Sequence, residues 1–346
     1  MKSEYTAIGV MAGSSMDGLD VVKVSLSKNG KWEYEFLKSK TYTYDSSLYS
    51  KLKNSSESLK KEQLELDLKF GQWIAKCLLD FGISKTDLIA VHGHTVIHDP
   101  DARISWQLGS GEEICKATEK VVVSDFRNED VQKGGQGAPL VPIGDFDLFS
   151  EYDACLNLGG IANISIAKTK EAWDICPCNQ VLNFYAEKMG KSFDHEGIWA
   201  REGEANHSWM QKIKSMDFFN QGPPKSLPNN FISSELLNET EPLVGLSSFT
   251  ELVSELILKD CSNHLSQGSM VLTTGGGAHN KFLLELLNKN SNEIVFKPGS
   301  EELTEYKEAL VFAFLGVLRV RNEVNTLASV SGAFEDSCSG TIHYPK

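Results

Sequence analysis

The sequence lacks an excess of positive charge, which a protein bound to nucleic acid or to an anionic membrane would need. Its 346 residues include 34 Lys and Arg against 47 Asp and Glu, so the formal net charge is −13. Binding to a phosphate backbone depends on clustered basic side chains that displace counterions. We therefore expect no nucleic acid and no membrane as a partner.

A hydrophobic run long enough to cross a bilayer is also missing. The most apolar window, ALVFAFLGVL at 309–318, has about ten residues, whereas a transmembrane helix needs roughly 20. The opening residues MKSEYTAIGVMAG lack the basic stretch and apolar core of a secretory signal. The seven scattered cysteines do not form the pattern of a disulfide framework. These features predict a soluble, cytoplasmic protein with reduced thiols.

The length and the apolar content predict a large core divided between two lobes. The chain is longer than a usual single domain, and 41% of its residues are hydrophobic. Residues 5–27 read as strand, turn and strand, and residues 47–80 carry apolar side chains at helical spacing. Residues 155–167 repeat the hairpin pattern without repeating its sequence, and residues 307–320 predict a helix with a wide apolar stripe. The pattern is that of a mixed α/β protein.

Glycine-containing turns follow several of the predicted strands. Three of them are AGSSMDG at 12–18, LNLGGIAN at 156–163 and TTGGGAHN at 273–280. Successive backbone N–H groups without bulky Cβ atoms form a concave site for anions. One such turn alone is more typical of an ordinary hairpin, but three in one chain favour polyphosphate binding.

The first of these turns also carries side chains suited to a phosphate and a metal ion. Ser14 and Ser15 supply hydroxyls, and Asp17 and Asp20 supply carboxylates that suit a hydrated Mg²⁺. The alternative is that each aspartate is only a turn residue. Two other nucleotide motifs are excluded: MGKS at 189–192 has Tyr185 where the Walker motif needs glycine, and the first strand lacks the dinucleotide glycine spacing.

The segment DICPCN presents a carboxylate and two thiols next to the predicted start of a helix at Asn179. Asp174 would face the N-terminus of that helix, either as a surface cap or as a functional group. Cys176 and Cys178 suggest zinc or redox chemistry, but no second pair lies at a ligand spacing. A metal at the cysteines is therefore the weaker interpretation.

Two further clusters of polar residues follow predicted strands. His92, His94 and His98, with two aspartates nearby, have a spacing that can bind zinc, and the alternative is separate pocket or surface histidines. In VVVSDFRNED, Asp125, Arg127 and Asp130 either clamp a substrate or pair with one another.

Taken in order, these segments resemble the anhydro-N-acetylmuramic acid kinases over nearly the whole chain. The segments are IGVMAGSSMDGLD, HGHTV, SDFRNEDVQKGGQGAPLVP, LNLGGIANIS, DICPCN, GPPKS, TTGGGAHN and KEALVFA. The resemblance implies the two-lobed actin-like ATPase fold, related to ribonuclease H, in which a cleft holds ATP. We expect an N-terminal lobe at 1–130 joined by the tail 325–346, and a C-terminal lobe at 131–324. A homodimer is one alternative for the oligomeric state.

The resemblance also implies a reaction of peptidoglycan recycling. ATP, 1,6-anhydro-N-acetylmuramic acid and water give N-acetylmuramic acid 6-phosphate and ADP. A base activates water, which attacks C1; the C1–O6 bond opens, and O6 accepts the γ-phosphoryl group while Mg²⁺ and backbone N–H groups stabilise the charge. The alternatives are a kinase for another amino sugar, a non-catalytic nucleotide-binding homologue, and a metal hydrolase built on the histidines.

Site residues carry over from the family by position. The catalytic base corresponds to Asp174. Contacts to the ATP phosphates and Mg²⁺ correspond to Gly13, Ser14, Ser15, Asp17, Gly18, Asp20, Gly159, Gly160 and Asn163, with Mg²⁺ near Asp17 or Asp20 through water. Contacts on the adenosine side correspond to Gly275, Gly276 and Gly277, and those to the sugar to His92, Thr95, Arg127 and Glu308. Arg127 suits the lactyl carboxylate, because a guanidinium binds it bidentately.

The sequence departs from the family pattern mainly beside the expected base. Ile175, Cys176 and Cys178 stand where Thr, Gly and Gly are common, and His94 stands where Gln is common. Ser14 replaces a threonine and keeps its hydroxyl, and Asn183 replaces an acidic residue. Losing two glycines restricts the backbone near the phosphate. These departures bear on substrate identity more than on the fold.

Overall fold

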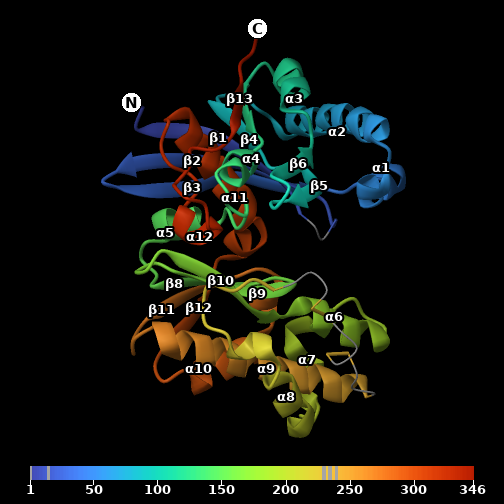
Figure 1. Ribbon diagram of the computed structural model, residues 1–346, viewed down its shortest axis with the longest axis vertical. Helices are drawn as coiled ribbons and strands as arrows, with labels where there is room; N and C mark the ends of the chain where they lie inside the picture. Colours follow the sequence, from blue (N-terminus) through green and yellow to red (C-terminus); the bar gives the residue numbers. More distant parts are fainter. Residues whose placement is uncertain (1, 14–15, 228–230, 233–235, 238–240) are drawn as a thin grey trace. The chain divides into compact units, whose positions relative to one another are not determined.

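The computed structural model contains two compact α/β units (Figure 1). It describes residues 2–13, 16–227, 231–232, 236–237 and 241–346. The first unit combines Met1–Leu148 with Tyr306–Lys346, and the second is Phe149–Glu305. Each unit has a main mixed sheet with helices against it, which confirms the predicted α/β class. No helix in the described part of the chain is long and apolar enough to span a membrane.

The predicted lobe boundaries at 130 and 325 lie inside the first unit. Helix α5 (Pro142–Leu148) and most of α11 (Glu301–Val320) belong to this unit. The two helices approach closely, because a Cβ atom added to Gly144 would lie 2.6 Å from a methyl group of Val311. Packing between segments far apart in the sequence therefore determines the extent of the unit.

The main sheet of the first unit has the strand order β13-β7-β4-β1-β2-β3. β1 (Glu4–Ala12), β2 (Leu19–Asn29) and β3 (Lys31–Tyr42) form an antiparallel meander. β4 (Leu88–Val91) pairs parallel to β1, and β7 (Val121–Ser124) pairs parallel to β4. The hairpin predicted at 5–27 is confirmed, with Ala12 opposite Leu19 beside the tip.

Helices cover both faces of this sheet. Ile8 and Val10 share a core with α2 (Lys60–Phe81), whereas Gly9 points to the opposite face, because alternate residues of a strand face opposite sides. On that face α11 comes so close that a Cβ atom at Gly9 would lie within van der Waals overlap of the Ala309 carbonyl. The remaining elements of the unit are α1 (Ser46–Lys53), η1 (Ser55–Glu57), β5 (His94–Asp99), β6 (Ile104–Leu108), α3 (Gly111–Thr118), α4 (Asn128–Gln132), α12 (Ala328–Ser331) and β13 (Thr341–His343).

The sheet of the second unit has the order β10-β9-β8-β11-β12. β8 (Ala154–Leu158), β9 (Ile161–Ile166) and β10 (Glu171–Pro177) form a meander, and β11 (Met270–Thr274) and β12 (Val295–Pro298) continue it in parallel. The order β3-β2-β1-β4-β7 of the first sheet is thus repeated in the second unit. The hairpin predicted at 155–167 is confirmed.

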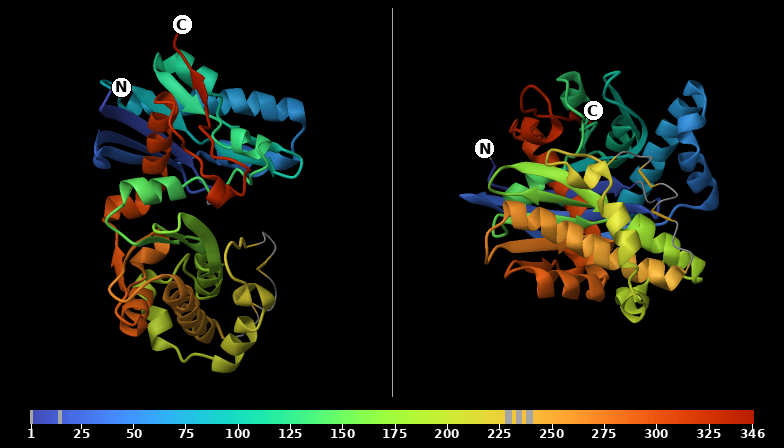
Figure 2. Two further views of the ribbon diagram at one scale, coloured as in Figure 1. Left: turned by 60° about the vertical axis from the view of Figure 1, so that its left-hand side comes forward. Right: turned by 60° about the horizontal axis from the view of Figure 1, so that its bottom comes forward.

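The long helix α9 (Pro242–His264) is the centre of the helical layer in the second unit (Figure 2). It packs against α6 (Asn179–Lys188), α7 (Ile198–Glu202), α8 (His207–Lys214) and α10 (Lys281–Asn290). The unit also contains the short helices η2 (His195–Gly197), η3 (Asp217–Asn220) and η4 (Gly276–His279). Because α6 ends at Lys188, the segment MGKS follows a helix end, which agrees with excluding the Walker motif.

Candidate active site

Polar side chains stand in one register across four strands of the second sheet. Asp174 of β10 pairs with Asn163 of β9, Asn163 pairs with Asn157 of β8, and Asn157 pairs with Thr274 of β11. The neighbouring row begins with the buried residues Trp173, Ile164 and Leu156. Sequence reasoning missed Asn157 and Thr274, although an amide inside the otherwise apolar strand ACLNL was a usable signal. The row brings the expected base next to the second glycine turn.

A β-bulge lies directly beside Asp174. Asp174 is opposite Asn163 and Cys176 is opposite Ala162, so Ile175 is an additional residue in β10. A bulge bends a strand and changes the direction of its side chains, and bulges are frequent at active sites. Ile175, Cys176 and Cys178 are all buried. These three departures from the family pattern therefore lie in the core of the second unit.

The thiols of this turn are not poised for metal or redox chemistry. Burial raises the pKa of Cys178 to about 12 and that of Cys176 well above its ordinary value, so both stay protonated near neutral pH. No group of three or more metal-ligating side chains gathers among the residues that the structure describes. All seven cysteines are free thiols.

The carboxylate of Asp174 is held on one side by residues 222–227, which we call the clamp segment. Its Oδ2 accepts hydrogen bonds from the Leu227 N–H at 2.8 Å and from the Ser226 hydroxyl at 3.3 Å. The Asp174 N–H donates to the Lys225 carbonyl at 3.0 Å. Within the described ranges no group donates a hydrogen bond to Oδ1. Ser226 and Leu227 thus hold Oδ2, whereas Oδ1 has no donor among the described residues.

The N–H groups at the start of α6 donate to the second glycine turn. The Cys178 and Asn179 N–H groups at the start of the helix donate to the carbonyls of Gly160 and Gly159, at 2.8 and 3.1 Å. Backbone donors in this turn therefore hold the glycine tip, and the clamp segment holds the carboxylate. Burial raises the pKa of Asp174, while its hydrogen bonds to Leu227 and Ser226 oppose that shift.

The second and third glycine turns pack against each other within this unit. A Cβ atom at Gly275 would lie 2.6 Å from the Asn157 side-chain oxygen, and one at Gly277 would lie 2.7 Å from Leu158. Gly275 has a φ of 80°, which favours glycine. The Asn179 amide donates to the Leu158 carbonyl at 2.9 Å. The structure thus gathers Gly159, Gly160 and Gly275–Gly277 around Asn157 and Asn179.

The first unit brings His92, Arg127 and Glu308 together. The Arg127 Nε and Nη2 groups lie 3.0 and 2.9 Å from His92 Nε2, and Nη1 donates to the Gly137 carbonyl at 2.7 Å. His92 Nε2 must act as the acceptor, so the ring is neutral and carries its proton on Nδ1. Burial, and then the charge of Arg127, lower the pKa of His92 well below its ordinary value.

The three residues differ in exposure: His92 is buried, Arg127 is half-buried and Glu308 is exposed. Burial lowers the pKa of Arg127 to about 10, and the charge of Glu308 opposes this. Desolvation by the surrounding protein raises the pKa of Glu308, although the residue is exposed; Lys307 and Arg127 lower the pKa, and Asp20 and Asp17 raise it further. Acidic groups of the first turn therefore act on Glu308. Thr95 is exposed on β5.

The first glycine turn is described in part. Ser14 and Ser15 lie outside the described residues, whereas Gly13, Asp17, Gly18 and Asp20 are included. The Thr41 hydroxyl donates to an Asp20 oxygen at 2.6 Å, and the Tyr44 hydroxyl donates to the Gly18 carbonyl at 2.9 Å. The turn is thereby tied to β3 and to the residues that follow it.

The remaining polar clusters do not form the arrangements considered from the sequence. His94 Nε2 lies 3.2 Å from the Leu52 carbonyl, and His98 Nδ1 lies 3.0 Å from the Ser105 hydroxyl, so the histidines have separate partners. Asp130 accepts hydrogen bonds from the Ser331 hydroxyl and the Gly137 N–H, at 2.6 and 2.8 Å. Asp130 therefore fixes the loop whose carbonyl binds Arg127, and it does not pair with that arginine.

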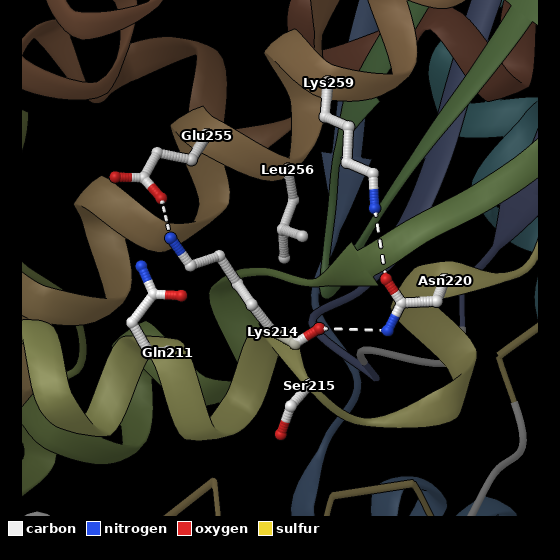
Figure 3. A pocket seen from close by; sticks show the side chains of 7 residues that line it. All are labelled: Gln211, Lys214, Ser215, Asn220, Glu255, Leu256 and Lys259. Carbon is white, nitrogen blue, oxygen red and sulfur yellow. Dashed lines mark hydrogen bonds and ion pairs between the residues drawn. The ribbon is translucent and has the colours of Figure 1, made fainter.

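A cavity of about 440 Å³ lies elsewhere in the second unit, between α8, η3 and α9 (Figure 3). It is lined by Gln211, Lys214, Ser215, Asn220, Glu255, Leu256 and Lys259. Its charged groups are already paired: Lys214 Nζ lies 2.6 Å from Glu255, and Lys259 Nζ lies 3.5 Å from the Asn220 oxygen (Figure 3). None of the predicted site residues lines it, and we assign it no ligand.

The α/β units and the match to a family of kinases define the chain as a phosphotransferase. The chain belongs to the anhydro-N-acetylmuramic acid kinase family, whose sequence model matches residues 5–345. The resemblance read from the motifs is thereby confirmed.

Curated relatives match over nearly their full length. The anhydro-N-acetylmuramic acid kinase of Zymomonas mobilis is 31% identical, with 98% of this chain and 99% of the relative covered. That of Gloeothece citriformis is 32% identical, with 98% of each covered. Among solved structures, the activator of the 2-hydroxyisocaproyl-CoA dehydratase from Clostridium difficile with bound ADPNP is 15% identical at a TM-score of 0.42, covering 92% of this chain and 98% of that one. The ROK hexokinase from Thermus thermophilus is 11% identical at a TM-score of 0.41, with 90% and 99% covered.

Proposed function

We propose that this protein is an ATP-dependent kinase that opens the 1,6-anhydro ring of anhydro-N-acetylmuramic acid with water. It phosphorylates O6 and yields N-acetylmuramic acid 6-phosphate and ADP, a step of peptidoglycan recycling. Family membership across residues 5–345 supports this activity. The observation that carries the mechanism is the Asp174 carboxylate, which keeps Oδ1 available while Oδ2 is held by Ser226 and Leu227.

The mechanism assigns Asp174 the role of general base. In the anhydro sugar O6 bridges to C1, so no free 6-hydroxyl exists and the base must act on water. Oδ1 accepts a proton from water, the water oxygen bonds to C1, and the C1–O6 bond breaks. The electron pair released on O6 attacks the γ-phosphorus of ATP, and ADP leaves. Holding Oδ2 in place orients Oδ1 toward the water before reaction.

The glycine turns of the second unit suit the nucleotide. Gly159 and Gly160 expose backbone beside Asn163, and we assign them to the phosphates. Gly275–Gly277 follow β11 at the same edge of the sheet and are assigned to the adenosine side. Asn157 lies between the two turns, within 2.6 Å of the position a Cβ atom would take at Gly275. We add Asn157 to the site as the residue that sets their spacing.

Carboxylates of the first unit suit a magnesium ion held through water. Asp17 and Asp20 both act on Glu308, which indicates a local concentration of negative charge that a divalent cation offsets. Mg²⁺ keeps several of its waters and binds few protein carboxylates, which matches the absence of a three-ligand cluster among the described residues. When bound, Mg²⁺ neutralises charge that develops on the transferred phosphoryl group.

The sugar is assigned to His92, Thr95, Arg127 and Glu308. Arg127 has five N–H donors, and its bonds to His92 and Gly137 use three of them, so the guanidinium keeps donors for the lactyl carboxylate. We place the reaction in the cytoplasm, where ATP is available and the seven thiols stay reduced.

The proposed reaction is tested with purified protein, MgATP and anhydro-N-acetylmuramic acid in H₂¹⁸O. We expect ADP release, phosphate on O6 and one ¹⁸O atom at C1, with the product reduced at once to prevent exchange at the free anomeric carbon. Asp174→Asn should bind ATP and show no turnover. A phosphorylated sugar without ¹⁸O at C1 would indicate transfer to an ordinary hydroxyl, and an inactive wild-type protein would indicate a non-catalytic homologue.

A further inference from the structure

A buried lysine occupies the clamp segment. Lys225 lies in neither a helix nor a strand, yet its side chain is only 4% exposed. Lysine is almost never buried without a partner, because removing an ammonium group from water costs free energy. Its Nζ atom lies 3.4 Å from Oδ2 of Asp260, which is on α9, and 5.2 Å from the centre of the Phe218 ring. The lysine thus fixes the clamp segment to the helical layer.

Asp260 also binds the strand that carries Asp174. The same Oδ2 atom accepts the indole N–H of Trp173 at 2.9 Å, and Trp173 is buried in β10. The Trp173 ring contacts that of His264, whose Nδ1 is 2.8 Å from the Asp260 carbonyl. One carboxylate of α9 therefore joins the clamp segment to the residue that precedes Asp174.

The backbone around Lys225 sets the donors to Asp174. The Lys225 carbonyl accepts the Asp174 N–H at 3.0 Å, and the next residues, Ser226 and Leu227, supply both hydrogen bonds to Oδ2. Residues 223–227 contain no regular hydrogen-bonded element that would hold these groups in place. Within the described part of the segment, the Lys225 side chain paired with Asp260 and the Leu227 side chain buried in the core are the interactions that do so.

We propose that Lys225, paired with Asp260, is a positioning residue that holds the clamp segment against Asp174 so that Oδ1 points to water. This inference rests on the proposed role of Asp174 as base. Lys225 acts through the Ser226 hydroxyl and the Leu227 N–H, since its own ammonium group is buried against Asp260 and Phe218.

The test compares the pH dependence of turnover in the wild type and in Lys225→Met, a substitution of similar length without charge. A loosened clamp segment donates less well to the carboxylate. We therefore expect kcat to fall about 10- to 100-fold with KM for both substrates nearly unchanged. The acid limb of the pH profile should move up by about one unit, because hydrogen bonds to a carboxylate lower its pKa.

Two variants serve as controls for this comparison. Lys225→Arg keeps the charge opposite Asp260 and should restore part of kcat and the wild-type acid limb. Lys214→Met removes another lysine paired to a carboxylate of α9, Glu255, and should change neither quantity. If Lys225→Met does not fold, Asp260→Asn is measured instead. This substitution keeps an oxygen for Trp173 and removes the charge. Its acid limb should also move up, by less than that expected for Lys225→Met.

The outcomes separate this inference from the proposed function. The inference is overturned if kcat and the acid limb of Lys225→Met equal those of the wild type. The same holds for Asp260→Asn where that variant is used. A raised KM for ATP at unchanged kcat would also overturn it, since Lys225 would then act on the nucleotide. If Asp174→Asn keeps turnover, both the role of Asp174 and this inference fail. If Asp174→Asn is inactive and Lys225→Met is unaltered, only the inference fails.

Discussion

At the scale of single residues, the two oxygens of Asp174 have different surroundings, and this difference controls how the carboxylate titrates. Burial raises its pKa, and the donors Leu227 and Ser226 lower it. Only the ionised carboxylate accepts a proton from water. Turnover should therefore be lost as the pH falls through the pKa of Asp174, and any change that weakens the donors should move this loss to higher pH.

The substitution Ser226→Ala tests how the donors to Asp174 affect the pH at which turnover is lost. Removing a hydroxyl that donates at 3.3 Å weakens stabilisation of the ionised form and leaves the Leu227 N–H in place. The acid limb of kcat/KM should rise by about half a pH unit, the size expected for one modest hydrogen bond. Ser215→Ala, which removes a hydroxyl bound to the Lys212 carbonyl, is the control and should not shift the profile. A downward shift would contradict the assigned hydrogen bond.

The residues of the site were predictable to different degrees. Asp174, the glycines and Arg127 lie within motifs, so the sequence alone identified them as candidates. The partners of Asp174 lie 52 and 53 residues further along the chain, and no local pattern indicates that contact. The departures at Cys176 and Cys178 seemed to restrict the backbone. Cys178 has a φ of −134° and a ψ of −103°, so its φ lies outside the left-handed range that favours glycine.

At the scale of elements, the hairpins at 5–27 and 155–167 and the helix at 307–320 were predicted, because alternation and helical periodicity are local signals. The helix begins earlier, at Glu301. Residues 47–80 form two α-helices, α1 and α2, separated by η1, since a periodic run of apolar residues does not mark where a helix breaks. The bulge at Ile175 depends on pairing with β9 and was not predicted.

The contact between β1 and α11 leads to a prediction on stability. Gly9 leaves no room for a side chain, because the Ala309 carbonyl and the Ala313 N–H both lie within 3 Å of a Cβ position. Gly9→Ala should push α11 away from the sheet and lower the free energy of unfolding by about 3 kcal/mol. Urea unfolding measures this change. Gly222→Ala, where the added methyl group meets open space, should cost far less, and equal losses would contradict the packing argument.

At the scale of the whole molecule, the two units share one strand order although their sequences do not repeat. In each, a three-stranded antiparallel meander is extended by parallel strands on the side of its first strand. Composition predicted two lobes, but the limits of the units follow from the packing of α5 and α11, which join segments far apart in the chain.

The net charge of −13 predicts how the rate depends on salt. An acidic protein repels the anionic nucleotide at long range, and dissolved ions screen that repulsion. Raising the ionic strength from roughly 0.01 M to 0.15 M should increase kcat/KM for MgATP by about twofold. The value of kcat at saturating substrates is the control and should stay constant. A decrease in kcat/KM would mean that local positive charge at the site outweighs the charge of the whole chain.

The second unit is inserted between two stretches of the first, and this order affects folding during synthesis. Residues 149–305 emerge as one continuous segment and contain every strand of their own sheet. The first sheet, in contrast, needs most of α11 to cover one face and β13 to complete its edge, and both come from the last stretch, Tyr306–Lys346. The first unit is therefore the first to begin during synthesis and the last to be complete.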